Sequence, residues 1–510
     1  AGLRDGRLRL RPAAALLAPG HGALAHAPGH LAGLRRSAGR GLPLRGARPE
    51  RRARPDGAAG VPGPGRLARH RGRIRARGRA RRRPGSTGTL TRRAARDGGA
   101  GMDTTRRHFT ALLAGSAGLA SASPGLRAAA GIAASPREAF DFSEERVPMN
   151  AANLCPSPRR VAEAVTHWTS VIDRDCSFQN RARFAEHLEA SRGAVAAQLG
   201  VSPDTIALVR NTSEANNIVN AGLDLGADDE VVIWDQNHPT NNVAWDVRAA
   251  RQGLRVVRVA VPAAPADAEA LIEPFRRALG PRTRVLSVTH VSNVSGIRLP
   301  IAELGALARE RGIHFHVDGA QSWGVHALDL DAVGCDSFSG SAHKWFMGPK
   351  EVGLLYVRAD RIASLWPAVV APGWGDDAET DLVGARKFES LGQRDDAALA
   401  ALGEAAALHD EIGPAAVEAH TLRLAQRLKE GLVEVGARLV TPMAPEFSGG
   451  VCIAEVPRAK RRELFDRLYR EHGIIGAPTG GLRLSPHLYN TDAHVDRAVE
   501  AVRTHAALLA

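Results

Sequence analysis

The chain has 510 residues, a formal net charge of +14 and 44% apolar residues, enough for two domains with substantial cores. Its four cysteines form no CxxC pair, so we expect neither a metal site nor a dithiol redox site. The charge is unevenly distributed, because residues 1–101 contain 25 Arg, no Lys and four acidic residues, a net charge of +21. The remainder therefore carries −7, and the basic character belongs to the first segment alone.

Residues 1–101 consist mainly of Arg, Gly, Ala, Pro and Leu, and they lack Met, Cys, Phe, Tyr, Trp, Asn and Gln. Such a composition cannot build a packed core, so we expect this segment to be disordered. Because the first methionine is Met102, we interpret the segment as non-native translation of upstream DNA. The alternative is a basic arm for nucleic acid or a membrane. No aromatic residues interleave with the arginines, so we expect no nucleic-acid partner.

Residues 102–134 have the pattern of an export signal. Arg106 and Arg107 precede an apolar run over residues 111–122 that is too short to span a bilayer and ends in small residues. This pattern resembles a twin-arginine (Tat) signal, which predicts a periplasmic protein, the Tat machinery as a partner and no stable membrane insertion. A chance pair of arginines is the alternative.

Between residues 135 and 392, apolar runs alternate with helical patterns. One helix is predicted over residues 301–311, where Leu304, Leu307 and Ala308 recur at helical spacing. This alternation predicts an N-terminal arm followed by a large α/β domain, with a mostly parallel sheet covered by helices on both faces. The predicted strands cover residues 206–209, 230–234, 254–261, 284–291, 313–317, 335–339 and 353–357.

The pattern changes after Gly392. Two long helical stretches are followed by short strands and then by two more helices. This order predicts a smaller α+β C-terminal domain over residues 393–510. The predicted helices cover residues 395–409, 415–435, 461–470 and 492–509.

Polar residues follow several of the predicted strands, at the sheet edge where α/β proteins bind ligands. Thr212 and Ser213 open a helix, where hydroxyls and free backbone N–H groups suit a phosphate. An ordinary N-cap has the same pattern. His238 could stack on a flat ring and shuttle a proton, although a single loop histidine usually does neither. Asn293 could donate a hydrogen bond to a phenolic oxygen.

Two charged residues complete this set. A carboxylate buried at Asp318 needs a cationic partner, and a protonated pyridine nitrogen is such a partner. Lys344 stands where a buried strand ends, and desolvation there would lower its pKa and favour the nucleophilic amine that forms a Schiff base. Taken alone, Lys344 could be a solvated loop lysine. Together these groups describe a binding site for pyridoxal 5′-phosphate (PLP).

The sequence resembles the class V aminotransferase superfamily, which includes cysteine desulfurases and isopenicillin N epimerase-like enzymes. The resemblance runs over residues 148–490 and rests on the segments HVSN, VDGAQ and SAHKWF, which hold Asn293, Asp318 and Lys344. It implies PLP fold type I, with a large domain built on a mostly parallel seven-stranded sheet, a smaller C-terminal domain and a homodimer. In relatives, the region of residues 388–393 reaches across to the partner subunit, but Gln393 stands where a hydroxyl residue is common.

The resemblance also implies roles for individual residues. Lys344 would carry PLP as the internal aldimine and act as general base, Asp318 would pair with the pyridine nitrogen, and His238 would stack on the ring. Arg483 would hold the substrate carboxylate through two parallel hydrogen bonds, and Asn153 lies in a segment that enters the site. The remaining cofactor contacts would come from Thr212, Ser213, Asn293, Gln321, Ser341 and His343.

One difference from the family pattern argues against one reaction type, the desulfurase reaction. Desulfurases carry a nucleophilic cysteine shortly before the substrate arginine, but residues 472–481 contain none, and Cys452 lies in an apolar run typical of a core. We therefore expect an enzyme that acts on the amino group of an amino acid or related metabolite, as aminotransferase, epimerase or lyase. A desulfurase or selenocysteine lyase is the alternative, and a non-catalytic PLP scaffold is less favoured.

Overall fold

The computed structural model describes residues 136–370 and 383–510. The predictions for residues 1–101 and for the export signal over 102–134 lie outside these ranges. Within them, no helix combines the length and the apolar character that a membrane crossing requires.

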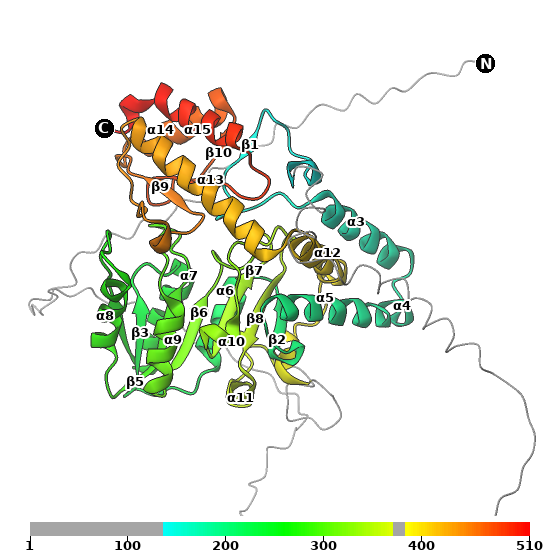
Figure 1. Cartoon of the computed structure of the whole chain (residues 1–510). Helices are drawn as coiled ribbons and strands as arrows, with labels where there is room; N and C mark the ends of the chain where they lie inside the picture. Colours follow the sequence, from blue (N-terminus) through cyan, green and yellow to red (C-terminus); the bar gives the residue numbers. More distant parts are fainter. Residues whose placement is uncertain (1–135, 371–382) are drawn as a thin grey trace, which may run out of the picture. The chain divides into compact units, whose positions relative to one another are not determined.

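A seven-stranded sheet forms the centre of the large α/β region (Figure 1). Its strand order is β2-β8-β7-β6-β5-β3-β4, and only the pairings of β8 with β2 and β7 are antiparallel. The predicted mostly parallel α/β fold is therefore confirmed, and each predicted strand has a counterpart in the sheet. The strands are β2 (Ile206–Val209), β3 (Glu230–Trp234), β4 (Arg255–Val259), β5 (Thr283–Thr289), β6 (His314–Asp318), β7 (Ser337–Ser341) and β8 (Gly353–Val357).

Alternating side chains of the strands pack on opposite faces of the sheet, as the pleat of a strand requires. On β3, Val232 and Trp234 join the main core, whereas Val231 and Ile233 pack with Trp245 of α7. Both faces are thus covered at β3, which explains why this strand is a nearly continuous apolar run. The helices of this region are α3 (Arg159–Arg174), α4 (Phe178–Ala182), α5 (Phe184–Gln198), α6 (Thr212–Gly222), α7 (Pro239–Gln252), α8 (Ala268–Ala278), α9 (Ile301–Glu310), α10 (Leu330–Val333) and α11 (Ala359–Ile362).

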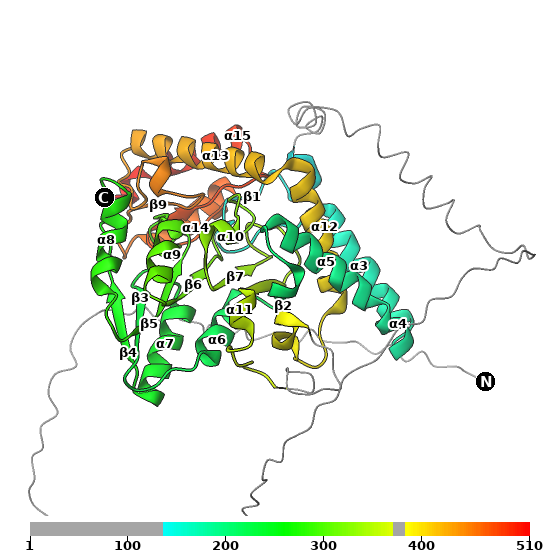
Figure 2. The ribbon, with the colours of Figure 1, turned by 60° about the horizontal axis from the view of Figure 1, so that its bottom comes forward.

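The C-terminal elements contribute to two cores. α12 (Asp396–Ile412) lies beside α3 and α5 (Figure 2), and its Leu399 and Leu402 belong to the main core. Leu424 and Leu428 of the next helix instead belong to a second core. The elements that follow α12 are α13 (Pro414–Glu434), β9 (Cys452–Ala454), α14 (Arg461–His472), β10 (Ile474–Ile475), β11 (Leu482–Leu484) and α15 (Asp492–Thr504).

The segment before the large region belongs to this second core. β1 (Val147–Pro148) pairs in parallel with β10, and Val147 and Met149 are fully buried there. Asn150 then bridges to Ser485, just after β11. The N-terminal arm is therefore held against the strand that carries Arg483. The predicted boundary between domains at residue 392 stays a prediction. α12, which follows this residue, packs with the large α/β region, and β1, which precedes it, packs with the C-terminal elements.

Candidate active site

The predicted site residues gather at the carboxyl edge of the parallel strands. Thr289 at the end of β5 is in register with Asp318 at the end of β6, and Asp318 is in register with Ser339 of β7. Lys344 follows the end of β7 by three residues, through a short turn. The parallel register alone therefore brings together residues that are distant in the sequence.

Hydroxyl groups lie at the start of α6. Asn211 caps this helix by accepting a hydrogen bond from the backbone N–H of Glu214, at 3.1 Å. Thr212 Oγ1 lies 2.7 Å from Ser341 Oγ, which also accepts from the backbone N–H of Thr212 at 2.9 Å. The positive end of the helix dipole and these two hydroxyls can hold an anion such as a phosphate. The structure thus joins Thr212 and Ser341 across 129 residues of sequence.

His238 is held at the start of α7 by Thr240. His238 Nδ1 lies 2.8 Å from Thr240 Oγ1, and Ser213 Oγ donates to the same hydroxyl at 3.3 Å. Thr240 thus connects two predicted site residues, a role that its sequence position, two residues after the histidine, could have suggested. Burial lowers the pKa of His238, and the neighbouring charges of Lys344 and Arg483 act in the same direction. The imidazole is therefore neutral near pH 7, as stacking on a flat ring requires.

Asp318 is a buried carboxylate whose position is fixed by two hydrogen bonds. Its side chain is 1% exposed. Oδ1 accepts from the backbone N–H of Ala320 at 3.1 Å, and Oδ2 accepts from Asn216 Nδ2 at 2.8 Å. An ionised carboxylate can accept about four hydrogen bonds, so Asp318 keeps the capacity to accept from a further donor such as a pyridinium N–H.

Asn216 was not among the predicted site residues. It lies one helical turn after Thr212, so both residues share one face of α6. Asn216 Oδ1 faces Ser339 Oγ at 2.6 Å and His316 Nε2 at 2.9 Å. Because an ionised Asp318 only accepts hydrogen bonds, the amide must direct Nδ2 to Asp318 and Oδ1 to the other two groups. Asn216 therefore orients the carboxylate, and the i, i+4 spacing from Thr212 could have indicated it.

Lys344 is partly buried, and among the described residues no hydrogen-bond acceptor faces its amine. Burial lowers its pKa to about 8, because desolvation disfavours the charged form, while the carboxylate of Asp318 opposes the shift. Burial and the charges of Lys344 and Lys350 likewise lower the pKa of His343 to about 4. Near neutral pH, the nucleophilic amine of Lys344 is thus a minor form, but far more populated than for a lysine of ordinary pKa.

Arg483 is the cation of this site that has no acidic partner among the described residues. It is 4% exposed, lies on β11 and is buried without an ion pair. NH1 donates to the backbone carbonyl of Asn293 at 3.3 Å, NH2 to Asn150 Oδ1 at 3.4 Å, and Nε has no partner. Burial lowers the pKa of Arg483 to about 10, so the side chain remains charged at neutral pH. A buried guanidinium with long, incomplete hydrogen bonds fits an anionic ligand.

Three further predicted residues, Gln321, Asn153 and Asn293, differ in their contacts. Gln321 donates from Nε2 to the backbone carbonyl of Ala152 at 2.9 Å and accepts from Trp345 Nε1 at 2.8 Å, so one amide N–H remains for another acceptor. Asn153 is exposed, and Asn150 is the asparagine of this segment that contacts Arg483. Asn293 is buried beside Arg483, and its Oδ1 has no hydrogen-bond partner.

Cys452 and Cys155 are poorly suited to act as nucleophiles. Cys452 is fully buried on β9, and burial raises its pKa to about 12. Burial likewise raises the pKa of Cys155 to about 12. A thiolate, the reactive form, is therefore strongly disfavoured at both positions.

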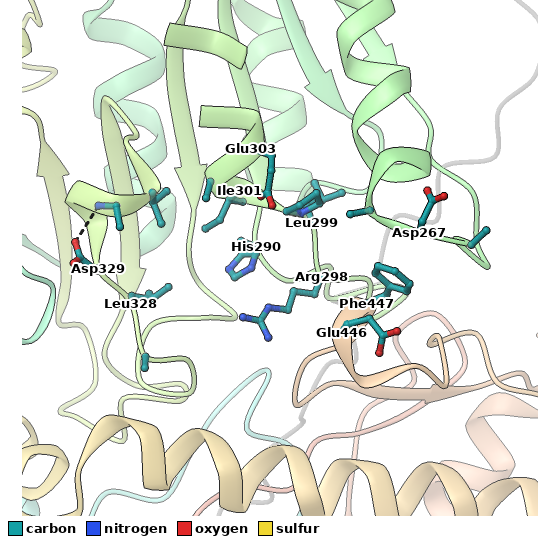
Figure 3. Close-up of a pocket in the computed structure, with 17 residues that line it drawn as sticks. Asp267, His290, Arg298, Leu299, Ile301, Glu303, Leu328, Asp329, Glu446 and Phe447 are labelled. Carbon is teal, nitrogen blue, oxygen red and sulfur yellow. Dashed lines mark hydrogen bonds between the residues drawn. The ribbon is translucent and has the colours of Figure 1, made fainter. Parts of the chain in front are cut away.

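A cavity of about 870 Å³ lies elsewhere (Figure 3). Its lining includes His290, Arg298 and Phe447, but none of the predicted site residues. The candidate active site is therefore identified by its chemical groups and their contacts rather than by the volume of a cavity.

Comparisons with known proteins show the family to which the chain is similar. A family model described as aminotransferase class-V matches residues 156–497. Isopenicillin N epimerase from Streptomyces clavuligerus is 32% identical over 373 residues, which cover 70% of this chain and 94% of that protein. A probable cysteine desulfurase from Methanothermobacter thermautotrophicus is 30% identical over 302 residues, 57% of this chain and 74% of that protein.

The fold has solved counterparts. A structure of a C-DES variant with glycine covalently linked to its PLP cofactor has a TM-score of 0.66 and 24% identity, and the match covers 72% of this chain and 98% of that one. This likeness supports the assignment to PLP fold type I. Since the family model spans well over half of the sequence, the chain belongs to the class V aminotransferase family, a family of PLP-dependent enzymes.

Proposed function

We propose that this protein is a PLP-dependent enzyme that acts on the α-amino group of a carboxylate-bearing amino acid or amino-acid-like metabolite. The reaction is transamination, epimerisation or elimination. The observation that carries the proposal is the buried Arg483, which has no acidic partner in the described ranges and whose charge acts on Lys344.

The residues present fit the cofactor. Thr212, Ser341 and the start of α6 suit its phosphate, and Asp318 suits a protonated ring nitrogen. His238 has the neutral imidazole that can lie against the ring, and Lys344 has the amine that can bond its aldehyde. The unpartnered Oδ1 of Asn293 and the free N–H of Gln321 are available for polar groups at the ring edge.

When bound, PLP supplies an electron sink that stabilises negative charge at the α-carbon of the substrate. The residues of the chain supply the remaining functions. Arg483 binds and orients the carboxylate, so that the α-proton faces Lys344. Lys344, with its lowered pKa, accepts that proton as general base. Asp318, oriented by Asn216, holds a proton on the ring nitrogen and so favours electron withdrawal.

A desulfurase would need a cysteine near Arg483. In the part of the chain that the structure describes, Cys452 is the neighbour on the paired strand, where it is in register with Leu484. Its burial and raised pKa disfavour persulfide chemistry. The wild-type protein should release no sulfide from cysteine beyond the level of a Cys452→Ser variant. Sulfide release that depends on Cys452 would transfer the protein to the desulfurase class.

The experiment that tests the function uses the purified protein loaded with PLP and a panel of L- and D-amino acids. Formation of a 2-oxo acid indicates transamination, a change of enantiomer indicates epimerisation, and loss of a side-chain substituent indicates elimination. Esters or amides of the same amino acids, which lack the carboxylate that Arg483 would bind, serve as matched controls. Equal turnover of acids and esters would contradict the proposed role of the carboxylate.

We also propose a homodimer. Apolar side chains that are about half exposed or more flank residues 371–382, and they include Val369, Val370 and Val383. The family resemblance implies that residues 388–393, which follow this segment, reach a partner subunit. Sedimentation of the purified protein should give twice the mass of one chain, and a concentration-independent monomer would contradict the proposal.

We further propose export by the Tat route, which the arginine pair at residues 106 and 107 and the following apolar run support. A reporter fused after residue 134 should reach the periplasm. Replacement of Arg106 and Arg107 by Lys should keep it in the cytoplasm, and unchanged export would contradict the proposal.

A further inference from the structure

The side chains of Glu471, His472 and His505 converge in the C-terminal region, away from the candidate active site. The Nε2 atoms of His472 and His505 lie 3.2 Å apart. Nε2 of His505 also lies 3.2 Å from Oε2 of Glu471, and the three atoms all lie within 4.8 Å of one another. Each residue thus contributes one possible ligand atom to the same small volume.

We propose that Glu471, His472 and His505 bind one divalent transition-metal ion of the zinc type. Two imidazoles and one carboxylate are a ligand set that zinc uses, with bonds of about 2.0–2.2 Å. Tetrahedral bonds of this length place neighbouring ligand atoms roughly 3.3–3.5 Å apart. The two separations of 3.2 Å are therefore close to the edges of such a tetrahedron.

One linear hydrogen bond does not account for both short contacts of His505 Nε2. A ring nitrogen has one in-plane position, which holds either a proton or a lone pair. His505 Nε2 nevertheless has two partners at the same distance, the nitrogen of His472 and the oxygen of Glu471. One proton cannot lie on both lines, whereas a single cation between the three atoms satisfies all of them.

The local backbone favours a cation at this place. α14 ends at His472 and α15 ends next to His505, so the negative ends of two helix dipoles meet here. Gly473 turns the chain immediately after α14 with φ of +69°, and a Cβ at this glycine would lie 1.9 Å from the backbone carbonyl of Glu145. The side chain of His505 is only 9% exposed. At least part of the site is therefore held by packing.

Two arginines lie close to the cluster without occupying the atoms that would bind the ion. Arg467 donates to the other carboxylate oxygen of Glu471, Oε1, at 3.4 Å. Arg497 donates to the backbone carbonyl of His472 at 2.6 Å. Both leave Oε2 and the two ring nitrogens available, and the contact with Arg467 orients the carboxylate.

The ion would join the last turn of α14 to the end of α15. It would thereby stabilise the C-terminal core, which contains Leu464 and Leu468 of α14 and Val499 and Val502 of α15. Three protein ligands leave one coordination position for water, so exchange with added metal should be possible.

The test titrates Zn²⁺ into the full chain, loaded with PLP and freed of any histidine tag, and follows binding by calorimetry and thermal unfolding. We expect one ion per chain and a rise in the unfolding temperature. His472→Gln and His505→Gln should each weaken binding at least tenfold, and Glu471→Gln gives the same information if a histidine variant does not fold. Co²⁺ in place of Zn²⁺ should show the visible absorption of a tetrahedral ion.

Glu463→Gln is the matched control, because Glu463 also pairs with Arg467 on α14 but is not part of the cluster. This variant should bind Zn²⁺ like the wild type. The proposal is overturned if Zn²⁺ does not bind, or if the double variant of His472 and His505 binds it as tightly as the wild type.

Discussion

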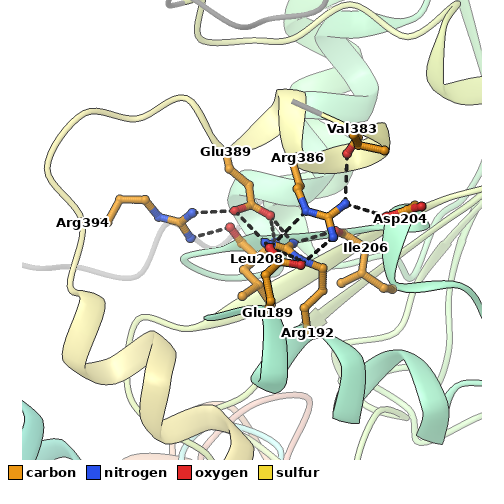
Figure 4. Close-up of polar contacts among 9 residues, drawn as sticks. All are labelled: Glu189, Arg192, Asp204, Ile206, Leu208, Val383, Arg386, Glu389 and Arg394. Atoms are coloured by element: carbon orange, nitrogen blue, oxygen red, sulfur yellow. Dashed lines mark hydrogen bonds and ion pairs between the residues drawn. The ribbon is translucent and has the colours of Figure 1, made fainter. Parts of the chain in front are cut away.

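Arg192 and Arg483 are the two least exposed arginines among the described residues, and their surroundings differ. Arg192 is 2% exposed and pairs with Glu389 and with Glu189, while NH1 also donates to the backbone carbonyl of Ile206 at 2.8 Å (Figure 4). Arg483 is 4% exposed and contacts only neutral oxygens, at 3.3 and 3.4 Å.

The difference separates a structural cation from a functional one. The two glutamates around Arg192 neutralise its charge. Glu389 also accepts hydrogen bonds from Arg394 and from the backbone N–H of Leu208. These contacts fix the segment of η4 (Gly384–Glu389) against β2. Arg483 lacks an anion, so a substrate carboxylate can supply one.

The buried Lys429 and the partly buried Lys344 show the same contrast. Lys429 donates to the carbonyls of Pro442 and Met443 and to Ser448 Oγ, at 2.8–3.1 Å. Lys344 has no comparable acceptors among the described residues, which leaves its amine available for chemistry.

The largest expected effect concerns Arg192. Arg192→Met should lower the free energy of unfolding by about 3–5 kcal/mol, because it removes the buried cation that Glu389, Glu189 and the carbonyl of Ile206 share. Denaturant unfolding measures this loss. Arg427→Met, which removes a half-exposed ion pair with Asp496, is the control and should change stability by less than about 1 kcal/mol. Equal losses in both variants would show that the cluster of Figure 4 is not a buried structural network.

Arg483→Ala should reduce activity more than stability, in contrast to Arg192→Met. We expect kcat/KM for carboxylate-bearing amines to fall by an amount equivalent to about 2–4 kcal/mol, with the PLP absorbance retained. The free energy of unfolding should change far less than in the Arg192 variant, because no ion pair is broken. Arg483→Lys keeps the charge but not the planar fork, so it should restore activity only in part. Loss of PLP from Arg483→Ala would contradict the assignment.

Asp318→Asn should reduce kcat at least tenfold, about 1.4 kcal/mol or more of barrier, because an amide does not favour a protonated ring nitrogen. Some PLP should remain bound through the phosphate contacts. Steady-state kinetics and the absorption spectrum of the variant provide the measurement, and wild-type turnover would refute the role of Asp318.

A smaller effect is expected from pH. The pKa of Lys344, lowered to about 8, predicts that PLP uptake by the cofactor-free protein accelerates as pH rises to about 8 and then levels off. A normal lysine would continue to gain reactivity up to about pH 10. The free energy of unfolding should also increase with pH in this range. Between these two pKa values the native state binds fewer protons at Lys344 than the unfolded state, so the contribution of Lys344 to stability increases with pH. Uptake that continues to accelerate above pH 9 would contradict the lowered pKa.

The seven strands of the sheet and the long C-terminal helices could be predicted from the sequence, because their apolar residues recur at strand or helix spacing. No ranges were predicted for helices such as α3, α5, α7 and α8. Lys344, Asp318 and Arg483 could be located from motifs. The contact of Asn216 with Asp318 could not, since it depends on the rotation of α6 against β6. The choice of Asn150 over Asn153 depends on how β1 pairs with β10. The absence of an acidic partner for Arg483 is equally a property of the packed structure.

The central claim is that Lys344, and not another buried lysine, carries the cofactor. Reduction of the PLP-loaded protein with borohydride, followed by digestion and mass spectrometry, tests it most directly. The account predicts one pyridoxyl group per chain, on the peptide that contains Lys344, and none on Lys429. Label on Lys429, or on any lysine other than Lys344, would contradict it.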